Sequence, residues 1–179
     1  MIGYNSYTIN KSGYMVQYPN TETITAPSVI KQNATITHTG GTAETKIFSQ
    51  LIPAGTFQAN DILYWCLRNG ATSNVNNKTF RVYFNDTDDL VTPTIIATVI
   101  VTNQGLSVTY DRDLVFKGSI SSQEILPATT NIFYYLTSTT APTALTIDFT
   151  ANQYFVVSCQ LAVGTDTAYL YGIKSLISR

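Results

Sequence analysis

The residues that could carry acid–base or nucleophilic chemistry are few in this chain. His38 is the single histidine, so a serine–histidine–aspartate triad would have to use it. The sequence contains no Gly-x-Ser-x-Gly motif, which would place a nucleophilic serine on a sharp turn. We therefore expect His38 to be a solvated or interface residue, and we expect a protein that is not an enzyme.

Three acidic side chains lie close together in the segment NDTDD, at Asp86, Asp88 and Asp89. A calcium loop needs about six to eight oxygen ligands and usually a glycine at its bend. This segment has neither that glycine nor a closing glutamate. It is interpreted as a solvated turn.

The remaining candidate carboxylates are spread along the chain. Asp111 and Asp113 flank Arg112, a pattern interpreted as a hairpin with balanced local charge. Asp148 and Asp166 lie at predicted strand ends. Nothing in the sequence brings two of these groups to the separation of about 5–10 Å that a glycosidase pair requires. We expect no metal site and no cofactor.

Both cysteines, Cys66 and Cys159, lie inside strand-like runs. The first residues have no cationic region followed by an apolar one, so we see no secretion signal. Buried free thiols are therefore favoured over a disulfide. Whether the two thiols are close to each other is left open.

The composition indicates an all-β protein. Charged residues make up only 12% of the 179 residues, about half the usual share. Thr, Ser, Asn and Tyr take their place, and β-branched and aromatic residues suit a pleated sheet. The net charge of −1 and the absence of a basic cluster exclude a nucleic-acid footprint. No apolar run approaches the roughly 18 residues that span a bilayer.

From about residue 43 the pattern is strand, turn, strand, with no amphipathic helix. Short strands at this spacing predict an antiparallel β-sandwich. The predicted strands are 44–52, 61–68, 79–84, 94–102, 105–110, 112–118, 131–137, 144–149, 153–163 and 166–176.

Residues 1–42 contain few apolar side chains in any regular period, so we expect an extended N-terminal arm or linker before a domain at 43–179. The arm carries four tyrosines, Tyr4, Tyr7, Tyr14 and Tyr18. They fit either a loosely packed tail or a docking peptide, since tyrosine provides contact area at low entropic cost.

The most ordered-looking stretch is IFSQLIPAGTFQANDILYW, residues 47–65. Pro53 cannot donate to a strand ladder, so it marks a strand end, and Gly55 permits a tight reversal. Phe57 is then expected to pack back as a plug between two sheets. Asn60 and Asp61 form the polar start of the next strand.

This turn resembles the opening of jelly-roll domains in fibre, tail-tip and decoration proteins of tailed bacteriophages. The stretch LTIDFTANQYFVVSCQLAVGTDTAYLYGIKSLISR is similar to their last strands, and the resemblance covers residues 43–179. It implies a jelly roll of the tumour-necrosis-factor-like kind, trimeric, non-catalytic and carried on the virion surface. The matching positions of the turn are Leu51, Ile52, Pro53, Ala54, Thr56, Phe57, Asp61 and Leu63.

Three predicted strands, near 131–136, 153–161 and 166–176, are apolar at both odd and even positions. A strand with one solvated face should alternate, so one face is expected to meet another subunit, or to be covered by loops. The candidate interface residues are Tyr134, Tyr154, Tyr169, Tyr171 and Ile173.

Two function classes follow from these patterns. The first is a structural virion protein, a homotrimeric head fibre, capsid decoration or fibre tip that is fixed to other virion proteins through residues 1–42. The alternative is a module for host recognition that binds a surface glycan or receptor, with the loop RNGATSNVNN at 68–77 as the expected contact.

Overall fold

The computed structural model describes residues 7–9, 15–17, 29–101, 107–126 and 141–179. These residues form strands and turns and contain no helix, which confirms the all-β prediction. None of them belongs to a helix that is long and apolar enough to cross a membrane. The strands are β1 (Tyr7–Ile9), β2 (Met15–Gln17), β3 (Lys31–Gln32), β4 (Ile36–Thr39), β5 (Thr45–Ile52), β6 (Ile62–Ala71), β7 (Lys78–Asn85), β8 (Thr94–Val101), β9 (Val108–Ser119), β10 (Ser122–Leu126), β11 (Thr143–Leu145), β12 (Gln153–Leu161) and β13 (Thr167–Ser178).

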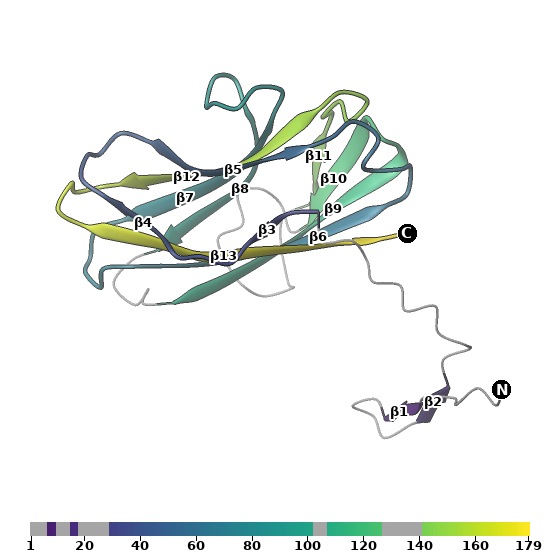
Figure 1. Ribbon diagram of the computed structural model, residues 1–179, viewed down its shortest axis with the longest axis horizontal. Helices are drawn as coiled ribbons and strands as arrows, with labels where there is room; N and C mark the ends of the chain where they lie inside the picture. The colour runs from purple at the N-terminus through teal and green to yellow at the C-terminus, as the bar shows by residue number, and fades with distance from the viewer. Residues whose placement is uncertain (1–6, 10–14, 18–28, 102–106, 127–140) are drawn as a thin grey trace.

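Two antiparallel sheets pack face to face, so the predicted β-sandwich is confirmed (Figure 1). The larger sheet has the order β11-β10-β9-β6-β13-β3, and β4 also pairs with β13. The smaller sheet has the order β5-β12-β7-β8. Strands β1 and β2 pair with each other in a separate two-stranded sheet.

The pairing of the main strands is nested. β4 pairs with β13, β5 with β12, β6 with β9, and β7 with β8. Each pair encloses the next along the chain, as in a long hairpin that has been rolled up so that its successive segments alternate between two sheets. β3, β10 and β11 extend the larger sheet beyond this set of eight.

The core fills the space between the sheets. In β6, Leu63, Trp65 and Leu67 are fully buried while Ile62 and Tyr64 are exposed, the alternation that a half-buried strand requires. Burying this apolar surface supplies the main stabilisation of the fold.

Phe57 occupies the predicted plug position. Its ring lies 4.8 Å from that of Phe116 on β9 and 4.9 Å from that of Phe149, between centroids. Phe149 in turn meets Phe84 of the smaller sheet at 5.0 Å. Gly55 makes the reversal possible with φ of 74°. The turn after β5 therefore joins the aromatic cores of both sheets, as the sequence predicted.

The predicted domain boundary at residue 42 is wrong for residues 29–42. Ile30 is fully buried in the core, and β3 and β4 pair with β13. The physical reason is that β13 has an open edge on this side, and the isolated apolar residues of the segment suffice to cover it. Tyr7 lies on β1 opposite Gln17; Tyr4, Tyr14 and Tyr18 lie outside the described residues.

The predicted hairpin at Asp111 is also wrong, because one continuous strand, β9, replaces the predicted pair 105–110 and 112–118. Tyr110, Arg112 and Leu114 all face the interior. The guanidinium carbon of Arg112 lies 3.8 Å from the centre of the Tyr110 ring, so an aromatic face compensates part of the cost of burying the charge. The turn falls after Ser119, and β10 follows it. The predicted strand 131–137 lies outside the described residues.

Candidate functional site

The outer face of the larger sheet is the most distinctive surface of the molecule. A β-bulge in β13 shifts its register against β6 between Leu170 and Gly172. Before the bulge Ala168 and Leu170 are buried, whereas after it Ile173 and Ile177 are. The bulge therefore changes which alternate positions face the core, and it turns Lys174 outward.

This bulge corrects the interpretation of β13 as apolar on both faces. The inward residues form a single apolar series that changes from even to odd positions at the bulge. Ile173 belongs to the core and is 2% exposed, so it is not part of an outer interface. Tyr169 and Tyr171 do lie together on the outer face, with parallel rings 5.8 Å apart.

The other candidate interface residues are not brought together. Tyr154 lies on β12, where Phe155 and Val157 face the core, so its side chain lies on the outer face of the smaller sheet. That face is separated from Tyr169 by the whole thickness of the sandwich. Tyr134 lies outside the described residues.

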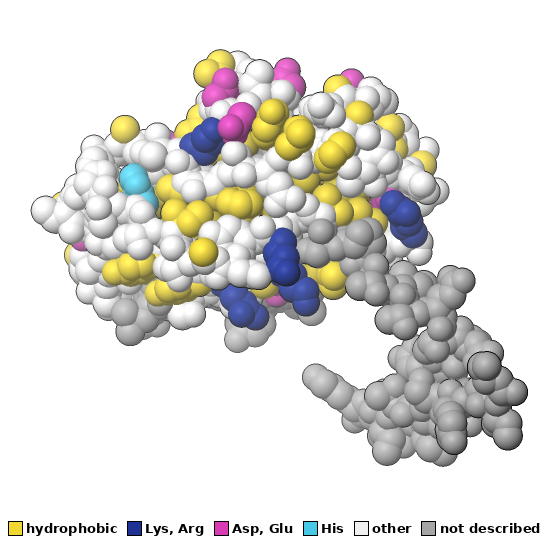
Figure 2. All heavy atoms as spheres, in the orientation of Figure 1, with side chains coloured by type: hydrophobic (Ala, Val, Ile, Leu, Met, Phe, Trp, Pro, Cys, Tyr) yellow, Lys and Arg dark blue, Asp and Glu magenta, His cyan; other side chains and the backbone are white. Residues whose placement is uncertain are grey.

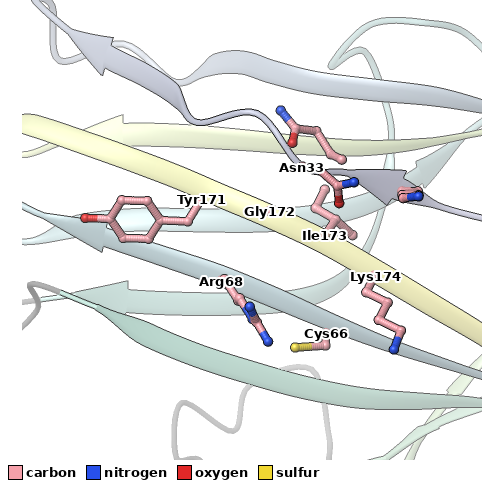
Figure 3. Close-up of a pocket in the computed structure, with 9 residues that line it drawn as sticks. Asn33, Cys66, Arg68, Tyr171, Gly172, Ile173 and Lys174 are labelled. Carbon is pink, nitrogen blue, oxygen red and sulfur yellow. The ribbon is translucent and has the colours of Figure 1, made fainter.

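A pocket of about 360 Å³ opens beside the bulge, where β3 runs alongside β13 (Figure 3). Arg68 and Lys174 flank Cys66 in this view. An added Cβ on Gly172 would lie 2.9 Å from the carbonyl oxygen of Gln32, so only glycine lets β3 approach so closely. The lining residues are Lys31, Gln32, Asn33, Cys66, Arg68, Tyr171, Gly172, Ile173 and Lys174.

The electrostatics of this pocket are cationic. Burial raises the pKa of the Cys66 thiol to about 11, and a hydrogen bond with Asp111 acts in the same direction, so the thiol is neutral near pH 7. No carboxylate lines the pocket. Figure 2 shows Lys and Arg side chains gathered beside hydrophobic ones in the region of β3 and β13.

An apolar patch lies beside the pocket on the same face. Ile62 and Tyr64 on β6 and Leu176 on β13 are each exposed by 36–37%. Leu176 is paired with Tyr64, and Ile62 with Val115. Tyr64 and Leu176 lie two residues along their strands from Cys66 and Lys174, which line the pocket, so the patch and the pocket adjoin, about 7 Å apart along the strands.

The carboxylates considered in the sequence analysis take structural roles. Asp113 lies opposite Tyr64 and Asp111 opposite Cys66 on the outer face, and burial, followed by the charge of Asp111, raises the pKa of Asp113. Asp166 lies 3.5 Å from the ammonium of Lys78. Asp148 accepts hydrogen bonds from Thr150.

The segment NDTDD is a self-bonded turn. Asp89 accepts hydrogen bonds from the backbone of Val91 and the side chain of Asn85, and Asp88 pairs with Lys46 at 2.8 Å. Within the described ranges no group of three or more His, Cys, Asp or Glu side chains could hold a metal ion. His38 lies on β4 opposite Ala168.

The predicted glycan loop is held from beneath by a buried lysine. The last part of RNGATSNVNN follows β6, and the Lys78 ammonium donates to the carbonyl oxygens of Thr72 and Asn76 at 2.9 Å and to the Asn74 side chain. Val75 at its tip is 80% exposed. Cys66 and Cys159 are free thiols, as expected.

The comparisons with known proteins return nothing: no family model, no curated protein and no solved structure matches the chain. The molecule is therefore defined here by its own fold and surfaces.

Proposed function

We propose that this chain is a non-enzymatic structural protein of a bacteriophage virion, a surface-exposed trimer of the head-fibre, decoration or fibre-tip type with a jelly-roll fold. The observation that carries the proposal is the nested pairing of eight strands in two sheets, in which the IPAGTF turn links β5 to β6. Eight strands in two sheets with Greek-key connections are the defining features of a jelly roll. The link to a virion comes from the resemblance of that turn and of the last strands to phage proteins.

The proposed trimer contact is the apolar end of the larger sheet. Ile62, Tyr64 and Leu176 form a patch that is rimmed by charged residues. An exposed apolar patch with a polar rim is typical of an interaction surface. Burial, followed by a hydrogen bond with Asp111, raises the pKa of Tyr64.

Light scattering tests the trimer directly. At micromolar concentration the wild-type mass should be close to three times 19.7 kDa. Tyr64→Glu should dissociate the assembly, because symmetry would place three desolvated negative charges at the contact. Tyr154→Glu, on the opposite outer face, is the matched control and should leave the mass unchanged. A wild-type mass of one chain would refute the trimer.

Attachment to the particle is assigned to residues 1–28, because residues 29–42 belong to the sandwich. A chain lacking residues 1–28 should remain folded and should no longer bind particles of the source phage. Binding that survives the deletion would place the anchor on the sandwich instead.

The alternative function is binding of a host glycan or receptor. The observation that favours it is the cationic pocket beside β3. The pocket adjoins the apolar patch on the same sheet face, so a subunit contact at the patch would place the pocket at the border of that contact.

A further inference from the structure

We propose that the pocket beside the β13 bulge binds an acidic saccharide, a sugar bearing a carboxylate or sulfate group, with Lys31, Arg68 and Lys174 facing the anion. This inference deepens the glycan-binding alternative and is independent of the virion assignment. It also moves the ligand site away from the loop 68–77, to which the sequence had pointed.

The distribution of positive charge is the first argument. The chain has ten Lys and Arg residues, and nine of them, all except Lys11, lie in the described ranges. Five of these nine form ion pairs with carboxylates, and Arg112 is buried over Tyr110. The three that remain, 9 − 5 − 1, are Lys31, Arg68 and Lys174, and all three line this one pocket.

Three like charges that share a pocket repel one another, so their convergence costs stability unless an anion neutralises it. The neighbouring Cys66 does not supply that anion, because its thiol stays protonated near pH 7. Asp111 on β9 accepts a hydrogen bond from the Cys66 thiol, so one carboxylate borders the pocket without lining it and offsets only part of the charge of the three cations.

The backbone builds the pocket from three strands that are distant in sequence. Lys31 comes from β3, Arg68 from β6 and Lys174 from β13. The bulge turns Lys174 to the outer face, and Gly172 admits β3 at a distance that no other residue would allow. A strand-based scaffold fixes the three positions more rigidly than loops would.

The size and the aromatic wall of the pocket favour a saccharide. A volume of about 360 Å³ is at the small end for ligand pockets, which suits one or two sugar rings. Tyr171, stacked on Tyr169, gives the pocket a rigid aromatic side against which the apolar face of a sugar ring can pack. Asn33 and Gln32 add amide groups that can bond hydroxyls.

The proposal is tested by calorimetric titration of the full chain with three oligosaccharides of similar length: an oligogalacturonate, which carries only carboxylates, a κ-carrageenan fragment, which carries only sulfates, and neutral maltotriose. We expect one or both acidic sugars to bind with a Kd below about 1 mM and maltotriose not to bind. Affinity should fall with added salt, because exposed charges are screened. The two acidic sugars distinguish a carboxylate ligand from a sulfate ligand.

Single substitutions locate the site. Arg68→Gln and Lys174→Gln should each weaken binding about tenfold or more, in the range expected for loss of a charge-assisted hydrogen bond. Lys117→Gln is the matched control, since Lys117 is on the same sheet but pairs with Glu124, and it should leave the Kd unchanged. All three positions are exposed, and melting curves will confirm that the variants fold.

Tyr171→Ala separates a sugar site from a simple anion site. It should weaken oligosaccharide binding and leave the binding of inorganic sulfate unchanged. If sulfate binds as tightly as the oligosaccharide and Tyr171→Ala has no effect, the saccharide assignment is overturned. If no acidic sugar binds at 10 mM (about ten times the expected upper Kd), or if Lys117→Gln weakens binding as much as Lys174→Gln, the site itself is overturned. None of these outcomes changes the mass measured for the trimer, so the two proposals fail separately.

Discussion

Replacing Phe57 by alanine tests whether the turn after β5 joins the two sheets. Phe57 is 2% exposed, and its ring contacts Phe116 at 4.8 Å and Phe149 at 4.9 Å. Substitution of a buried Phe by Ala costs about 3–5 kcal/mol through lost transfer energy and the cavity that remains. For a protein of this size each kcal/mol lowers Tm by about 2–4 °C, so the expected fall in Tm is about 6–20 °C.

Urea unfolding followed by circular dichroism measures the effect, with protein concentration held fixed because an oligomer's stability depends on it. The midpoint should fall while the slope of free energy against urea stays constant. Val75→Ala is the control, since Val75 is 80% exposed, and it should change stability by less than about 0.5 kcal/mol.

A double-mutant cycle with Phe149→Leu adds a second measurement, because the edge-to-face pair should give a coupling free energy of about 0.5–1.5 kcal/mol. A loss below about 1 kcal/mol for Phe57→Ala would refute the reasoning. It would mean that the aromatic contacts can close over the vacated space and that the turn does not determine the packing of the sheets.

Three further predictions concern other parts of the fold. Gly172→Ala should lower the free energy of unfolding by about 1–3 kcal/mol, because the added Cβ would lie 2.9 Å from the Gln32 carbonyl oxygen. Hydrogen exchange of the backbone amides near β3 should become faster, and an unchanged exchange rate would contradict this prediction. Deleting residues 1–42 should lower the free energy of unfolding by about 2–5 kcal/mol or more, because buried Ile30 is lost. Deleting residues 1–28 should leave Tm unchanged. If the two shortened chains have the same Tm, β3 and β4 do not stabilise the fold. Burial raises the pKa of Glu44, but hydrogen bonds from Ser158 and Tyr83 and its contact with Arg81 outweigh this and hold it below 4.5. The resulting stabilisation is present above pH 4.5 and is lost as the pH falls through the folded-state pKa, so Glu44→Gln should flatten the acid side of the stability curve; an unaltered acid limb would exclude this role.

The sequence predicted well what depends on neighbouring residues. Pro53, Gly55 and Phe57 lie within five positions, and their turn chemistry is local, so the reversal and the plug could be expected before the structure. Most of the strands and the antiparallel sandwich follow from alternation and turn residues in the same way. The short β10 was missed because its residues QEI carry too weak a pattern.

What depends on pairing between distant segments could not be predicted. The bulge in β13 arises from its register with β6, and without it the apolar residues of β13 suggest two apolar faces. Asp111 and Asp113 suggested a turn, because polar residues that point outward from a continuous strand look the same in the sequence as the polar residues of a hairpin turn. The pocket was missed because its lining comes from three distant segments. Gly172, two positions before Lys174 in an apolar strand, was the available signal, since glycine within a strand marks a bulge or a close approach.

The nested pairing also constrains how the chain folds. β4 at 36–39 pairs with β13 at 167–170, so the outermost contact cannot form until residues 167–170 have been synthesised. The innermost pair, β7 with β8, is nearly local and can form early, with the enclosing pairs added outward at increasing loop-closure cost. Chains dominated by such distant pairings fold in about milliseconds to seconds. During that time the edge of β13 is exposed, and we expect the short strands β3 and β4 to pair with it last. In the folded protein these two strands cover the edge of β13 and so prevent edge-to-edge aggregation.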